Sequence, residues 1–248
     1  DFMKIIQGMI RAFPLNNNSE LKISYYPTHF MKTWNNKDVI EPNHVNSGYT
    51  RHTKDKITIV IFRKEESKKV LIHELIHALS IHCVFYGTIN NISSKDEFFD
   101  ESIVETWACI LNLFRLSSPE FNIPIDKPEK FYYLFDKILF YQEREFCIKQ
   151  AARLLKQYGC NYSGLKCIKQ FQDKPAILSY YIIKAALLSN PKKFVEEFWW
   201  DNINKCKNIS LEQLKNYLIN NSFQKSIEYY YKHSNMYITM RMTKHGDF

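Results

Sequence analysis

The chain has 248 residues, of which 45% are hydrophobic and 15% aromatic, so its composition excludes a mostly disordered protein and fits one large domain. Its net charge is +8, but the lysines are scattered, and we find no basic helix with interleaved aromatics. We therefore expect no nucleic-acid partner. No run approaches the ~18 apolar residues of a membrane span.

The six cysteines form neither a CxxC pair nor a dense framework, and several lie inside apolar helical patterns. This usage favours free thiols in a reducing intracellular compartment, although the location is otherwise open. Cys160 and Cys167 flank a short Gly-containing loop, so one disulfide bridge there remains an alternative. A chain that begins at Asp1 is compatible with a trimmed or processed product.

The first third of the chain predicts one helix followed by strands. Apolar residues recur with helical spacing over 2–13, and the pattern stops at Pro14. Segments rich in β-branched and aromatic residues, separated by turn formers, then predict three strands. These strands are expected at 21–26, around Gly48 and Tyr49, and at 56–62.

The rest of the chain predicts helices. The segment from about Arg63 to Cys83 is apolar on nearly every side, which indicates a buried helix. Capping signatures, Pro and Gly mark the ends of the later helices. These are expected at 94–116, 126–159, 175–188, 191–200 and 211–231 with a break near Ser222. The predicted class is α+β, with a small mixed sheet in front and helices behind.

We find no internal repeat and no long linker, so residues 1–248 are predicted to form a single domain. Within it, residues 1–85 are expected to hold the sheet lobe and the apolar helix. Residues 86–248 are expected to form a predominantly helical lobe.

The apolar helix contains the segment LIHELIHAL, in which His73 and His77 are four residues apart. Residues at this spacing lie on one helix face, so the two imidazoles can bind the same zinc ion. Glu74 follows the first His and can accept a proton from a metal-bound water. The segment therefore predicts two zinc ligands and a catalytic general base, and its alternative is a helix with two ordinary histidines.

A catalytic zinc site needs a third protein ligand. The metzincin position for a third His, six residues after His77, is occupied by Cys83, and His82 points elsewhere around the helix. The downstream segment FDESIVETWACILNLF carries Glu101 and Glu105 four residues apart on one helix face. From spacing alone, Glu101, Glu105 and Asp100 all remain candidate ligands.

This combination of HELIH with a downstream Glu pair resembles the gluzincins, the thermolysin-like and neprilysin-like peptidases. The resemblance implies a zincin-like fold with the active-site helix between the two lobes. It also implies that Glu101 is the third zinc ligand and that Glu105 orients a ligand His through its ring N–H. The chain departs from the family in a longer interval from His77 to Glu101, and in having Glu105 where Asp is usual.

Two weaker resemblances concern shorter segments. The stretch from NSGYT to RKEESKKVLIHELIH is similar to HExxH proteins of giant DNA viruses. The fifteen residues HELIHALSIHCVFYG are locally similar to clostridial neurotoxin light chains. Neither likeness implies a substrate.

The function expected from these residues is zinc-dependent hydrolysis of a peptide bond, by an endopeptidase that acts on a peptide or protein substrate. The strand at 56–62 is expected to form the edge of the cleft. A gluzincin-like site also implies an oxyanion-binding Tyr, His or Arg from the later lobe. Candidates by type and position are Tyr229, Tyr230, Tyr231, His233, Tyr237 and Arg241.

Two other functions remain open at this stage. One is a different zinc hydrolase, such as a carboxypeptidase or an amidase, with the same chemistry of water activation. The other is a non-catalytic protein in which zinc only stabilises the helical lobe, or a binding module. An intact Glu74 argues against a decayed site. The sequence determines neither the cleavage specificity nor the oligomeric state.

Overall fold

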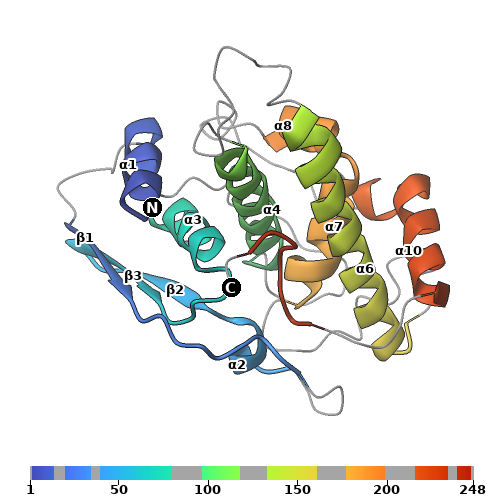
Figure 1. The fold of residues 1–248 in the computed structure, drawn as a ribbon, viewed down its shortest axis with the longest axis horizontal. Coiled ribbons are helices and arrows are strands. Elements are labelled where there is room, and N and C mark those ends of the chain that lie inside the picture. Colours follow the sequence, from blue (N-terminus) through green and yellow to red (C-terminus); the bar gives the residue numbers. More distant parts are fainter. Residues whose placement is uncertain are drawn as a thin grey trace.

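The computed structural model describes residues 2–13, 20–34, 40–79, 97–117, 133–160, 177–198, 216–233 and 239–246. These residues form a mixed α+β structure that is mostly helical and has a small three-stranded sheet. The sheet lies at one end of the molecule and the longer helices lie at the other (Figure 1).

The strands and the first helices have the following bounds: α1 Phe2–Ala12, β1 Glu20–Tyr25, α2 Pro42–Val45, β2 Gly48–His52, β3 Lys56–Ile61 and α3 Ser67–Ala78. The helical part contains α4 Glu97–Leu116, the π-helical segment η2 Tyr133–Phe140, α6 Tyr141–Gln157, the π-helical segment η4 Leu178–Ile183, α7 Lys184–Ser189, α8 Pro191–Phe198 and α10 Asn221–His233. The sequence did not predict α2, because four residues are too few to show helical periodicity.

The sheet has the strand order β1-β3-β2, with β1 parallel and β2 antiparallel to β3. Ile57, Ile59 and Ile61 of β3 are buried, and the residues between them are less buried, as a one-sided sheet requires. The prediction that 56–62 forms the cleft edge is wrong, because β3 is the central strand. Among the described strands, β2 forms the edge next to α3.

Helix α3 lies between the sheet and α4 (Figure 1). Every residue of α3 except Lys68 and His77 is buried, which agrees with the apolar pattern of its sequence. The sequence pattern predicts a start near Arg63, but the helix begins at Ser67. Glu66 has a left-handed backbone with φ of 60°, and a residue in this conformation cannot continue a helix.

The helical part matches the predicted helices where the structure describes them. Helix α4 ends at Leu116, and α6 ends at Gln157 just before Gly159, whose φ of 64° suits a helix C-terminus. Helix α10 packs along α6, while α4 contacts both α3 and η4. Helix α4 therefore connects the sheet end of the molecule to the other helices.

The C-terminal segment 239–246 runs back through the molecule toward α3 (Figure 1). The backbone N–H groups of Met242 and Thr243 each donate a hydrogen bond of 2.8 Å to Glu66 Oε1. The Thr243 hydroxyl donates to Glu143 Oε2 of α6 at 2.7 Å. The segment therefore joins the start of α3 to α6 through two buried carboxylates.

Glu66 also forms a buried ion pair with Lys32, with 2.5 Å between Oε2 and Nζ. We expect Glu66→Gln to lower the free energy of unfolding by about 3 kcal/mol, because the Lys32 ammonium would remain buried without its partner. Urea-induced unfolding measures the loss. The control is Glu20→Gln in the exposed pair with Lys56, for which we expect a change below about 0.5 kcal/mol. Equal losses in the two variants would show that the buried pair contributes no more to the free energy of unfolding than the exposed pair.

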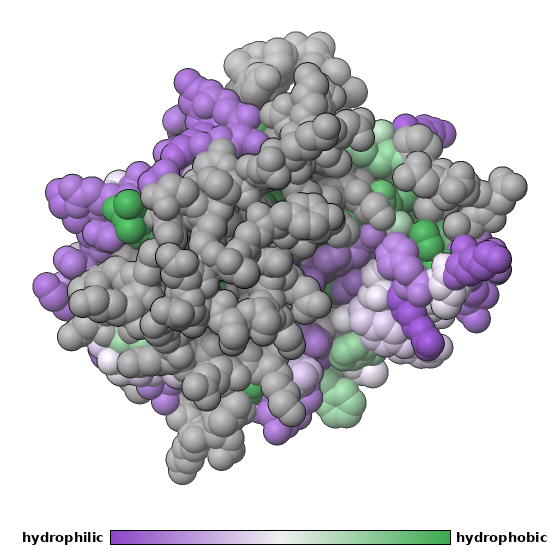
Figure 2. Space-filling view, turned by 180° about the vertical axis from the view of Figure 1, so that it is seen from behind, coloured by the Kyte–Doolittle hydropathy of each residue, from purple (hydrophilic) through white to green (hydrophobic). Residues whose placement is uncertain are grey.

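Cys109 and Cys147 are buried free thiols, as their apolar helical surroundings predicted. Cys160 is also buried but is disulfide-bonded, so the expectation of free thiols does not hold for every described cysteine. None of the described helices combines the length and the apolar character needed to cross a bilayer. Seen from behind, the described part of the surface is mainly hydrophilic, with hydrophobic residues singly or in small groups (Figure 2).

Candidate metal centre

Two packed helices carry the candidate ligands. His73 and His77 lie one turn apart on α3, and Glu101 and Glu105 lie one turn apart on α4. Residues four positions apart share a helix face, and α3 and α4 contact each other. The two histidines therefore face the two carboxylates.

His73, His77 and Glu101 come together as one group. Nε2 of His73 lies 3.2 Å from Nε2 of His77. Glu101 reaches both rings, with Oε2 3.4 Å from His73 Nε2 and Oε1 3.3 Å from His77 Nε2. The ligand atoms of the three residues all lie within 4.8 Å of one another, so the group could hold a metal ion.

Glu101 provides a second observation that fits a metal ion. Its Oε2 atom is buried, and its contact with His73 Nε2, at 3.4 Å, is too long for a well-formed hydrogen bond; the described residues offer it no better partner. A buried acceptor without a partner costs free energy, because it has lost its bonds to water. A cation between Glu101 and the two imidazoles would satisfy this oxygen. Two imidazole nitrogens and one carboxylate oxygen also form a common donor set for a transition metal.

Glu105 contacts the opposite side of the His73 ring. Its Oε2 lies 2.9 Å from His73 Nδ1, and its Oε1 accepts hydrogen bonds from Lys69 and Lys184. The side chain is fully buried, yet the positive charges of both lysines and the bond to His73 outweigh burial and hold its pKa well below the usual range. Glu105 is therefore an anion that fixes the orientation of the His73 ring.

Of the candidate third ligands, the structure groups Glu101 with the histidines and places Glu105 behind His73. The side chain of Asp100 lies outside the described side chains. His82 and Cys83 also lie outside the described residues, so their predicted lack of a ligand role stays a prediction.

Burial alone would lower the pKa of His73, but the hydrogen bonds and charges of Glu101 and Glu105 raise it to about 10. Below that pH, a metal ion must displace a proton from the ring. We expect metal affinity to rise about tenfold per pH unit between about pH 7 and about pH 9. Competition with a chelator, corrected for its own titration, measures this dependence. A constant affinity over that range would mean that His73 is already neutral.

Glu74 is held from the sheet side by Thr50 of β2. The Thr50 hydroxyl lies 2.7 Å from Glu74 Oε2 and 3.0 Å from the Glu74 carbonyl oxygen. A Cβ on Gly48 would lie 2.9 Å from the carbonyl oxygen of Val60 and 3.2 Å from Glu74 Oε1. Glycine therefore allows the close approach of β2 to Glu74. No sequence pattern pointed to Thr50, because its contact with Glu74 depends on the register of β2 in the sheet.

His73, Glu74, His77 and Glu101 line an open cavity of about 560 Å³. The other lining residues come from the β2 region and from η4: Asn46, Gly48, Tyr49, Thr50, His52 and Tyr180. Burial, the charges of Glu101, Glu105 and Glu74, and a hydrogen bond to Glu101 raise the pKa of Tyr180 well above its usual range. Tyr180 is therefore a neutral phenol that can donate a hydrogen bond beside the metal group.

The sequence missed Tyr180 because it lies in a helix among other buried residues and no local spacing links it to His73. The centroids of these two rings are 6.3 Å apart. The aromatic run that the sequence favoured instead lies in α10, whereas Tyr180 comes from η4, which packs against α4.

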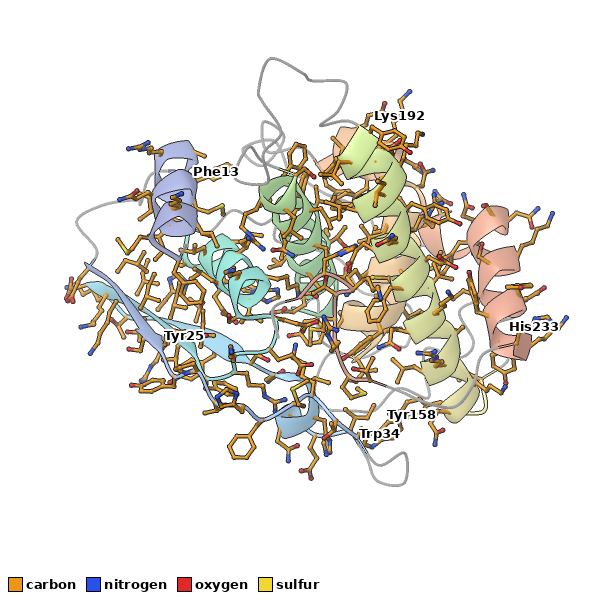
Figure 3. All side chains as sticks on the ribbon, viewed as in Figure 1. Phe13, Tyr25, Trp34, Tyr158, Lys192 and His233 are labelled. Carbon is orange, nitrogen blue, oxygen red and sulfur yellow. The ribbon has the colours of Figure 1, made fainter. Side chains whose placement is uncertain are left out.

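The described oxyanion candidates do not line the cavity. Arg241 lies 3.7 Å from Glu65 and 3.9 Å from Glu66, and His233 stacks on Tyr229 at the outer end of α10, far from α3 (Figure 3). The placement of Tyr230 and Tyr231 also differs from the prediction. Tyr230 donates to Glu145, Tyr231 packs against the hydrophobic core from α10, and Tyr237 lies outside the described residues.

The described geometry thus contains a group able to hold a metal ion, a carboxylate beside it, a phenol and an open cavity. Sequence spacing identified His73, His77 and Glu74, and the resemblance to gluzincins implied Glu101. Comparison with protein-family models, with curated proteins and with solved structures finds no significant match to this chain.

Proposed function

We propose that the protein is a zinc-dependent peptidase of the gluzincin type, and that it acts as an endopeptidase. The observation that carries the proposal is the grouping of His73, His77 and Glu101 within 4.8 Å, beside Glu74 in an open cavity. A sheet followed by a buried helix with two ligands and a second helix with the third is consistent with a zincin-like arrangement.

Zinc is the ion that this donor set favours. Catalytic zinc sites commonly have three protein ligands, including two His and one Glu, and leave one position open for water. The carboxylate behind His73 supports the choice, because a second carboxylate or carbonyl usually fixes a metal-binding imidazole through its other nitrogen. When bound, zinc supplies Lewis acidity to a water molecule and to the substrate carbonyl.

Glu74 is the general base in this proposal. It accepts a proton from the attacking water and passes that proton to the leaving amine. The hydrogen bond from Thr50 keeps one of its oxygens fixed, so that the carboxylate remains directed along the cavity wall. Tyr180 donates a hydrogen bond to the oxygen that becomes negative as the peptide carbonyl is attacked.

The edge strand β2 offers a binding site for an extended peptide. Residues 48–52 pair with β3 on one side and border the cavity, so a substrate can add as a further strand beside the metal group. Main-chain hydrogen bonds would then provide affinity with little dependence on side chains. An open cavity of this kind supports cleavage within a chain more than removal of terminal residues.

Two measurements on the same preparation test this function. The metal content after dialysis is expected to be one zinc per chain, and a peptide library is expected to be cleaved at internal bonds. Chelation should abolish cleavage and added zinc should restore it. Bound zinc without cleavage of any peptide or amide would point instead to a structural role, and absence of zinc binding would reject the proposal.

Tyr180→Phe removes the proposed oxyanion donor together with the hydrogen bond of its hydroxyl to Glu101. We expect kcat for peptide cleavage to fall about 100-fold with little change in KM, because the hydrogen bond forms only in the transition state. Steady-state kinetics on one library substrate measure both constants. The neighbouring variant Tyr181→Phe is the control, since the Tyr181 hydroxyl bonds the Met240 carbonyl at 2.7 Å and does not line the cavity. An equal loss of kcat in both variants would assign the effect to packing.

A further inference from the structure

Two buried lysines lie behind the candidate metal centre, and the proposed chemistry does not use them. Lys69 is 2% exposed and Lys184 is 1% exposed. Lysine is rarely buried to this extent, because an ammonium group loses its hydration in the interior. Both ammonium groups contact Oε1 of Glu105.

Lys69 belongs to the same helix face as the two histidines. It lies four residues before His73, just as His73 lies four before His77, so α3 presents Lys, His and His in one row. On the facing helix, Glu105 contacts Lys69 and His73, while Glu101 contacts His73 and His77. The contacts between α3 and the carboxylates of α4 thus continue one helical turn beyond the metal group, to Lys69.

The two oxygens of Glu105 have different partners. Oε1 accepts hydrogen bonds from Lys69 and Lys184, and Oε2 faces His73 Nδ1 at 2.9 Å. Lys184 is itself fixed by a hydrogen bond to the Met242 carbonyl. Ammonium groups only donate hydrogen bonds, so they hold Oε1 away from the ring and keep Oε2 directed at Nδ1.

We propose that Lys69 and Lys184 are positioning residues of the metal centre, which act on His73 through Glu105. They fix the carboxylate so that the His73 ring directs Nε2 toward His77 and Glu101. The inference deepens the proposed function and rests on it, because it concerns metal affinity at the same site.

The alternative is that the lysines serve only the stability of the fold. The pair of Lys32 and Glu66 provides the comparison, since it is equally buried and contacts the C-terminal segment. Lys32 makes no hydrogen bond or ion pair with Glu105 in the described structure. The Lys32 charge does act on Glu105 at longer range, so a variant of Lys32 reports the loss of a nearby buried ammonium that makes no direct contact with Glu105.

The experiment measures zinc affinity by chelator competition for the wild type, Lys69→Met, Glu105→Gln and the double variant, with Lys32→Met as control. Lys69→Met is expected to weaken zinc binding about tenfold, the lower end of the range for outer partners of a metal-binding His. In the Glu105→Gln background the same change is expected to have less than about a twofold effect, because its route to His73 is gone. Lys32→Met, which removes no direct contact to Glu105, is expected to change zinc affinity less than about twofold, and an effect as large as that of Lys69→Met would overturn the positioning role.

Each outcome has a separate meaning. Failure of the wild type to bind zinc would reject the proposed function itself. Zinc binding unchanged by Lys69→Met, or weakened equally in both backgrounds, would overturn the positioning role while leaving the function intact. If Lys69→Met does not fold, as judged by circular dichroism, Lys184→Met takes its place in the same comparison and with the same criteria.

Discussion

Glu74→Gln is expected to reduce kcat for peptide cleavage about 1,000-fold, which lies within the range for loss of a general base. Gln has nearly the same shape as Glu and keeps an oxygen that can accept the Thr50 hydrogen bond, but it cannot take a proton from water. Since Glu74 is not part of the ligand group, zinc affinity should stay close to that of the wild type.

The measurement pairs single-turnover cleavage of a library substrate with zinc content after dialysis. Glu196→Gln on the exposed face of α8 controls for the loss of one carboxylate, and its kinetics should equal those of the wild type. Retained zinc with lost cleavage supports catalysis by Glu74. Full cleavage by the variant would remove Glu74 from the mechanism.

Glu101→Ala is expected to have the largest effect on metal binding. It removes one of the three atoms grouped within 4.8 Å, so zinc affinity should fall more than about 100-fold, beyond the range for residues that support a ligand. Glu105→Ala should weaken binding about 10- to 100-fold, because His73 would keep its place on α3 but lose the partner of its Nδ1.

Both variants are measured by chelator competition, together with thermal unfolding in the metal-free state. Glu105→Ala should also destabilise the fold, because it removes the carboxylate that forms ion pairs with the buried Lys69 and Lys184. Glu101→Ala should destabilise it less, since Glu101 is more exposed than Glu105. If Glu105→Ala abolishes zinc binding and Glu101→Ala only weakens it, the ligand assignment is wrong.

The pairing of the candidate ligands was predictable from the sequence because it depends on local helix geometry. A helix fixes the relation between residues four positions apart, so His73 with His77, and Glu101 with Glu105, could be paired from sequence before their helices were placed. Spacing did not distinguish the two carboxylates; the gluzincin resemblance implied Glu101 as the ligand, and the structure groups Glu101 with the histidines. Which helical turn of α4 faces His73 Nε2 depends on the tertiary packing of α3 on α4.

The residues that the sequence missed all act across long chain separations. Thr50 meets Glu74 because the β2 register places it there, and Tyr180 reaches the cavity from a π-helical segment. Lys69 had one local signal, its position four residues before His73, whereas Lys184 had none. The oxyanion candidates of α10 were chosen by residue type, and aromatic residues are more often used for packing.

The secondary structure likewise divides into elements that local patterns predict and element ends that depend on contacts between distant residues. Strands β1, β2 and β3 and the end of α4 follow from residue preferences and periodicity, so the sequence predicted them closely. The start of α3 depends on the left-handed Glu66, whose carboxylate binds the C-terminal segment. Because residues 66 and 243 are far apart in the chain, a local sequence pattern cannot predict their contact.

An anomalous-scattering map from a crystal grown with zinc tests the central claim most directly. It should show one peak about 2.0–2.2 Å from Nε2 of His73, Nε2 of His77 and an oxygen of Glu101, with water as the fourth ligand facing Glu74. A peak closed by four protein ligands would favour a structural zinc site. A zinc ion bound elsewhere, or no peak among these three residues, would contradict the account.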